Sequence, residues 1–226
     1  MCVGLDLDGT LLASRPRHLA ALKASAQIAG VSLTEEVVRA YAGLQAGGDN
    51  GLTALRKLGV PRAEQISQEE WIQMIEDSDL LVLDRLYDDT LRALEEEHDL
   101  SRKFVLVTSR RHADRVHHQI EALGLARFMS DVLVVDGPSG ITKAAATRDR
   151  GLQAVVGDTE VDSQWALDLD VPFYASYFGF RSERFWRAQN VESYGSLSQI
   201  FQILRSQIPM KWREKSWSQT NSTSTN

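Results

Sequence analysis

Short apolar runs alternate with amphipathic segments along most of this chain, and this alternation limits the possible folds more than any other feature. The runs are rich in β-branched or aromatic residues and end near Gly, Asp, Ser or Pro, as buried parallel strands do. Strands that alternate with helices form βαβ units, which place helices on both faces of a parallel sheet. The expected strands are Cys2–Leu7, Phe104–Thr108, Val132–Val135, Ala154–Gly157 and Val171–Ala175. The expected helices between the later strands are Arg111–Leu123, Thr142–Arg150 and Glu160–Leu169. We therefore predict an α/β fold with a Rossmann-like parallel sheet.

A long helical interruption separates the first expected strand from the second. It contains no recognisable strand but several amphipathic segments, namely Arg17–Ala29, Thr34–Leu44, Leu52–Leu58 and Gln68–Leu86. Asp88–His98 then has the pattern of a helix that returns to the sheet. A connection this long far exceeds an ordinary loop, so we predict an inserted all-helical domain. Its two crossings, near Ala13–Arg17 and Leu86–Asp89, would form a hinge. The predicted organisation is an α/β core at 1–13 and 88–210, a helical insertion at 14–87 and a disordered polar tail at 211–226.

Composition excludes several classes of protein. The 226 residues include 25 basic and 31 acidic side chains, and the formal charge of -6 argues against nucleic acid and anionic membranes as partners. The single cysteine, Cys2, excludes an internal disulfide framework and a multi-cysteine metal site. We see no signal peptide and no apolar run near the roughly 20 residues that span a bilayer. We therefore expect a soluble cytoplasmic protein, with its oligomeric state left open.

Polar side chains gather where the expected strands end. Ligands of an open parallel sheet bind beyond the carboxyl ends of its strands, so these side chains share one edge. They are Asp6 and Asp8 after the first strand, Thr108 and Ser109 at the end of the second, Asp158 and Asp162 after the fourth, and Lys143 at the start of a preceding helix. Each has an ordinary structural interpretation, such as a turn before glycine or a helix N-cap. Their joint placement at one edge favours a functional interpretation.

Electrostatics indicates what such an edge would bind. Two carboxylates about 4 Å apart repel by about 4 kcal/mol at an effective dielectric constant of 20, so a cluster of them needs a cation. The candidate ligands are all oxygens, which favours Mg²⁺ over Zn²⁺. Lys143 and the backbone N–H groups around Ser109 would bind phosphate charge. This set of groups suits phosphoryl transfer through an aspartyl-phosphate.

Four motifs in order resemble those of the haloacid dehalogenase superfamily. They are DLDGTL at 6–11, VLVTS at 105–109, GITKA at 140–144 and GDTEVD at 157–162. Together they are specific, although GDxxxD alone would be a weak signal. The resemblance covers the whole chain except the tail, and the insertion between the first two motifs resembles the helical cap of phosphoglycolate-phosphatase-like members.

The resemblance implies a role for each matching residue. Asp6 would be the nucleophile, and Asp8 would protonate the leaving oxygen and then activate water, with Thr10 helping to orient it. Thr108 would bind the phosphate, and Lys143 would stabilise Asp6 and the intermediate. The implied Mg²⁺ ligands are Asp6, the backbone carbonyl of Asp8, and Asp158, with Asp162 acting directly or through water.

The second acid of the first motif separates branches of the superfamily. Dehalogenases resemble this pattern but lack an acid at the position of Asp8, because a departing halide needs no proton. Its presence favours phosphate chemistry. Four further residues are candidates for substrate contact, three of them near the loop AGGDNG at 46–51: Arg110, Arg39, Gln45 and Arg56.

The sequence therefore predicts a Mg²⁺-dependent phosphatase that acts on a small phosphorylated metabolite. A phosphomutase on the same scaffold is the nearest alternative. A non-catalytic phosphoacceptor of the receiver type also presents strand-end acids, a hydroxyl group and a lysine, but the long insertion and the DxD spacing argue against it. A binding protein without activity is a further alternative that intact acids disfavour. The physiological substrate depends on side chains of the insertion, whose orientation sequence does not give.

Overall fold

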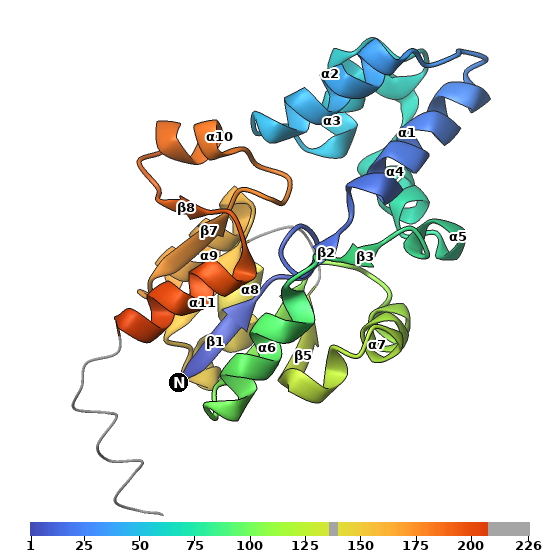
Figure 1. Ribbon diagram of the computed structural model, residues 1–226. Coiled ribbons are helices and arrows are strands. Elements are labelled where there is room, and N and C mark those ends of the chain that lie inside the picture. Colours follow the sequence, from blue (N-terminus) through green and yellow to red (C-terminus); the bar gives the residue numbers. More distant parts are fainter. Residues whose placement is uncertain (136–139, 208–226) are drawn as a thin grey trace, which may run out of the picture.

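The computed structural model describes residues 1–135 and 140–207, and its centre is a six-stranded sheet (Figure 1). The strand order is β5-β4-β1-β6-β7-β8, and every neighbouring pair is parallel. The strands are β1 (Cys2–Leu5), β4 (Lys103–Thr108), β5 (Met129–Val134), β6 (Ala154–Gly157), β7 (Phe173–Ser176) and β8 (Ser193–Tyr194). The predicted α/β class with a parallel sheet is confirmed, although β8 was not predicted.

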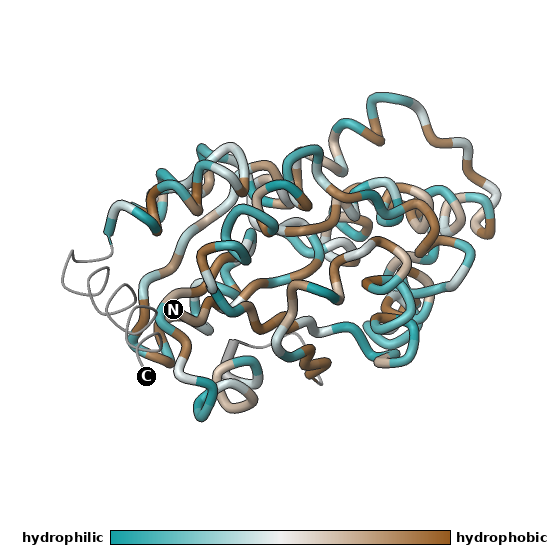
Figure 2. The backbone as a smooth tube through the Cα atoms, turned by 60° about the horizontal axis from the view of Figure 1, so that its bottom comes forward, coloured by the Kyte–Doolittle hydropathy of each residue, from teal (hydrophilic) through white to brown (hydrophobic). Residues whose placement is uncertain are grey.

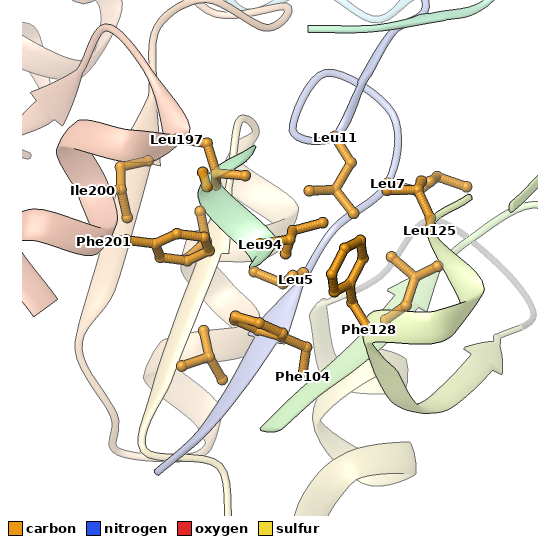
Figure 3. Close-up of a cluster of buried hydrophobic side chains, with 14 of the residues drawn as sticks. Leu5, Leu7, Leu11, Leu94, Phe104, Leu125, Phe128, Leu197, Ile200 and Phe201 are labelled. Atoms are coloured by element: carbon orange, nitrogen blue, oxygen red, sulfur yellow. The ribbon is translucent and has the colours of Figure 1, made fainter. Parts of the chain in front are cut away.

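Helices cover both faces of the sheet because successive strand residues point to opposite sides. Phe104 and Leu106 of β4 belong to one cluster with residues of α6, α7 and α11, whereas Val105 and Val107 belong to a second cluster with α8 and α9. Figure 3 shows Phe104 of the first cluster with Leu94 of α6 and Phe201 of α11. Trp165 of α9 is fully buried in that second cluster. The bounds of these helices are α6 (Thr90–Asp99), α7 (Ala113–Ala122), α8 (Gly140–Thr147), α9 (Glu160–Asp168) and α11 (Leu197–Ser206). The remaining elements of this part are α10 (Glu183–Ala188), η2 (Ala126–Phe128) and η3 (Arg148–Arg150).

The helical insertion has a hydrophobic core of its own. Tyr41, Leu55 and Trp71 are buried in a cluster whose members all come from residues 21–71. Its helices alternate between hydrophilic and hydrophobic residues, as amphipathic helices do (Figure 2). Their bounds are α1 (Arg15–Ile28), α2 (Glu35–Ala46), α3 (Gly51–Lys57), η1 (Ala63–Gln65), α4 (Gln68–Ile75) and α5 (Ser78–Leu81).

The predicted helix over Gln68–Leu86 was wrong in its second half. The segment divides into α4, α5 and a short strand, β3 (Arg85–Leu86), so the interruption does contain a strand. Its partner is β2 (Leu12–Ala13), and the two pair in antiparallel register with Leu12 opposite Leu86. A two-residue strand is too short to give a periodic pattern, so this ladder between the two crossings could not be recognised from sequence.

The domain boundaries predicted at residues 13/14 and 87/88 stay predictions, although both lie close to the β2–β3 ladder. The predicted disordered tail at 211–226 lies outside the described residues. Across the described residues, no helix has both the length and the apolar character to cross a membrane.

Candidate active site

Three neighbouring strands bring the acidic motifs to one edge of the sheet. Asp6 follows β1, Thr108 ends β4 and Asp158 follows β6, and β4, β1 and β6 are adjacent in the sheet. All three side chains are buried. Carboxylate oxygens of Asp6, Asp158 and Asp162 lie within 4.8 Å of one another. Folding therefore gathers acids that are more than 150 residues apart in the sequence.

A buried lysine sits between two of these acids. Lys143 Nζ lies 2.5 Å from Asp6 Oδ1 and 2.7 Å from Asp162 Oδ1. Burial opposes the charge of Lys143, but Asp162 and Asp6 outweigh burial and raise its pKa. Asp162 is fixed in turn by the main-chain N–H and the hydroxyl group of Thr159, at 3.1 and 2.8 Å. This contact belongs to the capping box that begins α9, so a helix start also orients a site residue.

The lysine does not fully compensate the negative charge around Asp6. Burial raises the pKa of Asp6 to about 7, and repulsion from Asp162 adds to this effect while Lys143 opposes it. Burial also raises the pKa of Asp158, with Asp6 and Asp162 contributing in the same direction. Three buried carboxylates therefore share one ammonium group, and the electrostatic imbalance favours a cation.

The two carboxylate oxygens of Asp158 have different surroundings. The main-chain N–H of Phe180 donates to Asp158 Oδ2. Asp158 Oδ1 is buried and has no hydrogen-bond partner in residues 1–135 and 140–207. A Cβ atom at Gly9 or Gly179 would lie 2.1 or 2.3 Å from Asp158 Oδ2, so both positions require glycine. An orphaned buried oxygen among three carboxylates fits a hard divalent ion that oxygen ligands bind, such as Mg²⁺.

Asp8 is not part of this carboxylate cluster and instead forms ion pairs with two arginines. Arg110 binds it with two nitrogens, with Nη2 at 2.6 Å from Oδ1 and Nε at 2.7 Å from Oδ2. Arg17 Nη2 lies 2.6 Å from Oδ1, and the Ser14 hydroxyl group donates to the same oxygen. Burial opposes the charge of Asp8, but Arg110 and Arg17 outweigh it and hold the pKa of Asp8 well below its ordinary value.

Asp84 completes this ion-pair network. Arg17 Nε lies 3.2 Å from Asp84 Oδ1, and Arg110 Nη2 lies 2.8 Å from Asp84 Oδ2. Sequence reasoning named Arg110 but missed Ser14, Arg17 and Asp84. Ser14 followed by Pro16 has the pattern of an ordinary helix start, which hid its contact with Asp8. The available signal for Asp84 was a carboxylate in the apolar run LLVLD at 80–84, since a buried acid needs a partner.

Two hydroxyl groups of the motifs are also without partners. Thr10 Oγ1 and Ser109 Oγ are buried and make no hydrogen bond within the part of the chain that the structure describes. Thr108 is almost fully buried at the end of β4. Buried hydroxyl groups normally find a partner, so these atoms mark a place where a polar ligand would bind.

The structure does not bring Arg39 or Arg56 to the carboxylates. Arg39 is exposed and pairs with Glu35 on the same helix, at 3.3 Å. Arg56 binds the backbone carbonyls of Ala63 and Ile66 inside the helical insertion.

Gln45 is buried at the boundary between insertion and core. Its backbone carbonyl accepts a hydrogen bond from Arg181 Nη1 at 2.8 Å, and the carbonyl of Asp49 lies 3.3 Å from the same nitrogen. Arg181 also binds Glu160 at the start of α9. Ser182 N–H donates to the carbonyl of Ala46 at 3.1 Å. The loop at 46–51 therefore contacts the segment after β7, and Arg181 is a contact that sequence reasoning missed.

The fold and the site together define an α/β protein with a cluster of buried acids at the carboxyl edge of its parallel sheet. A family model for haloacid dehalogenase-like hydrolases matches residues 1–166. The chain belongs to this hydrolase family, and the resemblance inferred from the four motifs is confirmed. No curated protein matches the chain.

Solved structures share this fold over nearly the whole chain. A predicted phosphoglycolate phosphatase from Haemophilus somnus 129pt aligns with a TM-score of 0.65 at 18% identity, covering 90% of this chain and 97% of that one. A haloacid dehalogenase-like family hydrolase from Streptococcus pneumoniae gives 0.69 at 16%, covering 90% and 97%. A protein proposed to be a β-phosphoglucomutase, from Thermotoga maritima, gives 0.63 at 17%, covering 92% and 99%. At these identities the similarity establishes the fold alone.

Proposed function

We propose that this enzyme is a Mg²⁺-dependent phosphatase that hydrolyses a small phosphorylated metabolite through an aspartyl-phosphate on Asp6. The observation that carries the proposal is the position of Asp6 between Lys143 and two further buried carboxylates. The chemistry needs a nucleophilic carboxylate, compensation of phosphate charge, and a second acid that moves protons.

Asp6 is suited to the role of nucleophile. Lys143 holds its Oδ1, and no hydrogen bond within residues 1–135 and 140–207 involves its Oδ2. In the first step, Oδ2 would attack phosphorus, and the bond between phosphorus and the substrate oxygen would break. In the second step, water would attack the same phosphorus, release inorganic phosphate and restore the carboxylate of Asp6.

Asp8 would handle the proton in both steps. It would first donate a proton to the leaving oxygen and then accept one from the attacking water. The guanidinium groups of Arg17 and Arg110 favour its charged form, which is the form that the second step requires. Proton transfer by such a group contributes typically about 10²–10⁴-fold to a rate.

The remaining groups would bind the transferred phosphate and a metal ion. Lys143, the hydroxyl groups of Thr108 and Ser109, and the nearby backbone N–H groups supply donors for phosphate oxygens. Mg²⁺ held by Asp6, Asp158 and the backbone carbonyl of Asp8, with Asp162 in support, would supply positive charge against the carboxylates and the phosphate.

Replacing Asp6 by Asn tests the assignment. We expect Mg²⁺-dependent phosphate release from p-nitrophenyl phosphate to fall by more than about 1,000-fold, because the amide cannot form the acyl phosphate. Asp168→Asn is the matched control, since Asp168 is exposed on α9 and its carboxylate accepts a hydrogen bond from Gln164 on the same helix. Turnover of Asp6→Asn at the wild-type rate would end the assignment of the nucleophile.

The same intermediate would serve a phosphomutase, and the fold similarity to the Thermotoga maritima protein keeps this alternative in view. A phosphomutase returns the phosphoryl group to a sugar, whereas a phosphatase transfers it to water. Incubation with hexose phosphates, followed by measurement of both isomer and free phosphate, separates the two. A non-catalytic phosphoacceptor would instead release no more than one phosphate per molecule. The cytoplasmic location and the absence of nucleic-acid partners stay predictions.

A further inference from the structure

We infer that Ser14, Arg17 and Asp84 are positioning residues that couple the place of the helical insertion to the orientation of Asp8. The inference rests on the proposed function, because it concerns the proton that Asp8 would deliver. It assigns a task to three residues that the four motifs do not include.

The contacts to Asp8 come from both the helical insertion and the core. Ser14 and Arg17 follow β2 directly and begin the helical insertion, and both contact Asp8 Oδ1. Arg110 lies in the loop that follows β4 in the core. One carboxylate is therefore held by two groups of the insertion and one group of the core.

Asp84 connects these groups across the second crossing. It directly precedes β3 and bridges the two guanidinium groups, with Arg17 on Oδ1 and Arg110 on Oδ2. Gln119 Nε2 adds a hydrogen bond of 3.2 Å to Asp84 Oδ2 from helix α7 of the core. The side chains of Arg17, Arg110 and Asp84 are each 5% exposed or less, so water competes little for these contacts. A displacement of either crossing would change the geometry around Asp8.

The hydroxyl group of Ser14 is an independent sign of this task. Ser14 occupies the N-cap position of α1, where serine usually accepts a hydrogen bond from the helix backbone. Ser14 makes no such capping bond, and its hydroxyl group donates to Asp8 instead. By contrast, Ser67 caps α4 with a complete capping box in the same insertion. At Ser14 the hydroxyl group therefore contributes to the site rather than to the helix start.

The coupling predicts a dependence on the leaving group. Asp8 would have to present its proton to the leaving oxygen, and a basic leaving group needs this proton more than a weakly basic one. Phenoxide is more basic than p-nitrophenoxide, while phenyl phosphate and p-nitrophenyl phosphate differ little in size. The value of kcat/KM reports the steps up to phosphoryl transfer to Asp6. The ratio of kcat/KM for phenyl phosphate to kcat/KM for p-nitrophenyl phosphate therefore measures how well the leaving oxygen is protonated.

The test compares Ser14→Ala with the wild-type enzyme on these two substrates. We expect kcat/KM for phenyl phosphate to fall about 10-fold and that for p-nitrophenyl phosphate about twofold, since the carboxyl group of Asp8 loses a contact that orients it toward the leaving oxygen. Asp84→Asn is a second variant of almost unchanged shape, and we expect its ratio to shift in the same direction. Ser67→Ala is the matched control, which loses a true N-cap and should leave the ratio unchanged.

The outcomes separate the coupling from the proposed function. An equal loss on both substrates, or no loss on either, in both Ser14→Ala and Asp84→Asn would overturn the coupling and leave the phosphatase intact. A wild-type enzyme that releases phosphate from neither substrate would overturn the proposed function, and the coupling with it. A shifted ratio in either variant, with an unshifted ratio in Ser67→Ala, would support the coupling.

Discussion

Asp6 and Asp8 are separated by one residue at the end of one strand, yet they lie in opposite electrostatic surroundings. On the Asp6 side, three buried carboxylates share the single ammonium group of Lys143. On the Asp8 side, two guanidinium groups face Asp8 and Asp84. Burial raises the pKa of Asp6 to about 7, whereas on Asp8 the arginines overcome burial and lower the pKa.

This difference indicates that position in the charge network, rather than residue type, would give the two acids the different roles proposed for them. The excess of negative charge around Asp6 suits a metal ion. The same site can accept an anionic phosphate group only after such a cation has been added. A balanced set of charges around Asp8 leaves it without need of a metal. Two identical side chains can thus serve as nucleophile and proton carrier because their environments differ.

The largest expected effect comes from removing the ammonium group that contacts both Asp6 and Asp162. In Lys143→Met, Asp6 and Asp162 lose the group that compensates them, so we expect turnover to fall by more than about 1,000-fold. The free energy of unfolding at pH 8 without Mg²⁺ should fall by about 3–5 kcal/mol, since breaking a buried ion pair leaves uncompensated charge.

Lys57→Met is the control for this prediction, because Lys57 forms an exposed ion pair with Asp49. Such surface pairs contribute little, and the control should change stability by less than about 1 kcal/mol. Unfolding in urea measures both variants. A Lys143→Met protein as stable and as active as the wild type would show that the two sides do not differ in the way described.

The pH dependence of stability should differ in sign between the two acids. The pKa of Asp6 is about 7 in the folded protein against an ordinary value of 3.8, so between these pH values the folded state holds a proton that the unfolded state has lost. Without metal, Asp6 therefore makes stability fall as pH rises from about 4 to about 7, by up to about 4 kcal/mol. In Asp6→Asn, the free energy of unfolding should therefore depend less on pH over this range.

For Asp8 the sign is reversed. Its pKa is lowered on folding, so its charge contributes stability above pH 3.8 that is lost only as pH falls further. Asp8→Asn should therefore destabilise the protein at neutral pH. Urea titrations from about pH 2 to 8 in the presence of a chelator measure both variants, and parallel curves for the two would contradict the comparison.

A smaller effect is expected from crowding Asp158. The Cβ atom of Gly179→Ala would lie 2.3 Å from both Asp158 Oδ2 and the carbonyl oxygen of Gly9, so the loop must shift. We expect a loss of about 1–3 kcal/mol in stability, together with weaker Mg²⁺ binding measured by calorimetry. Gly43→Ala, in a helix with no atom near the new methyl group, should be neutral or slightly stabilising. Unchanged Mg²⁺ affinity in Gly179→Ala would argue against Asp158 as a ligand.

The parts of this molecule that sequence predicted are those with local or repeated signals. All five expected strands overlap observed strands in at least three residues, because buried parallel strands have continuous apolar runs. The helical insertion was recognisable from its length.

The unpredicted parts depend on long-range partners. Arg17, Arg39 and Arg56 are chemically identical in sequence, but one is buried against Asp8, one is exposed and one binds carbonyls of its own insertion. The helical pattern gives the face of a residue only roughly and says nothing about which element covers that face. Asp84 is similar, because its two arginine partners lie 67 and 26 residues away in opposite directions.

The two-residue ladder between β2 and β3 has a consequence for how such enzymes diversify. Paired strands lie about 5 Å apart, so the polypeptide leaves the sheet and re-enters it at nearly one point. Segments of very different size can be exchanged at such a point without rebuilding the sheet beneath. Ser14, Arg17 and Asp84 lie just beyond that junction, so each exchange would also replace side chains that contact Asp8 or its arginine partners. Substrate specificity and the orientation of Asp8 would therefore change together.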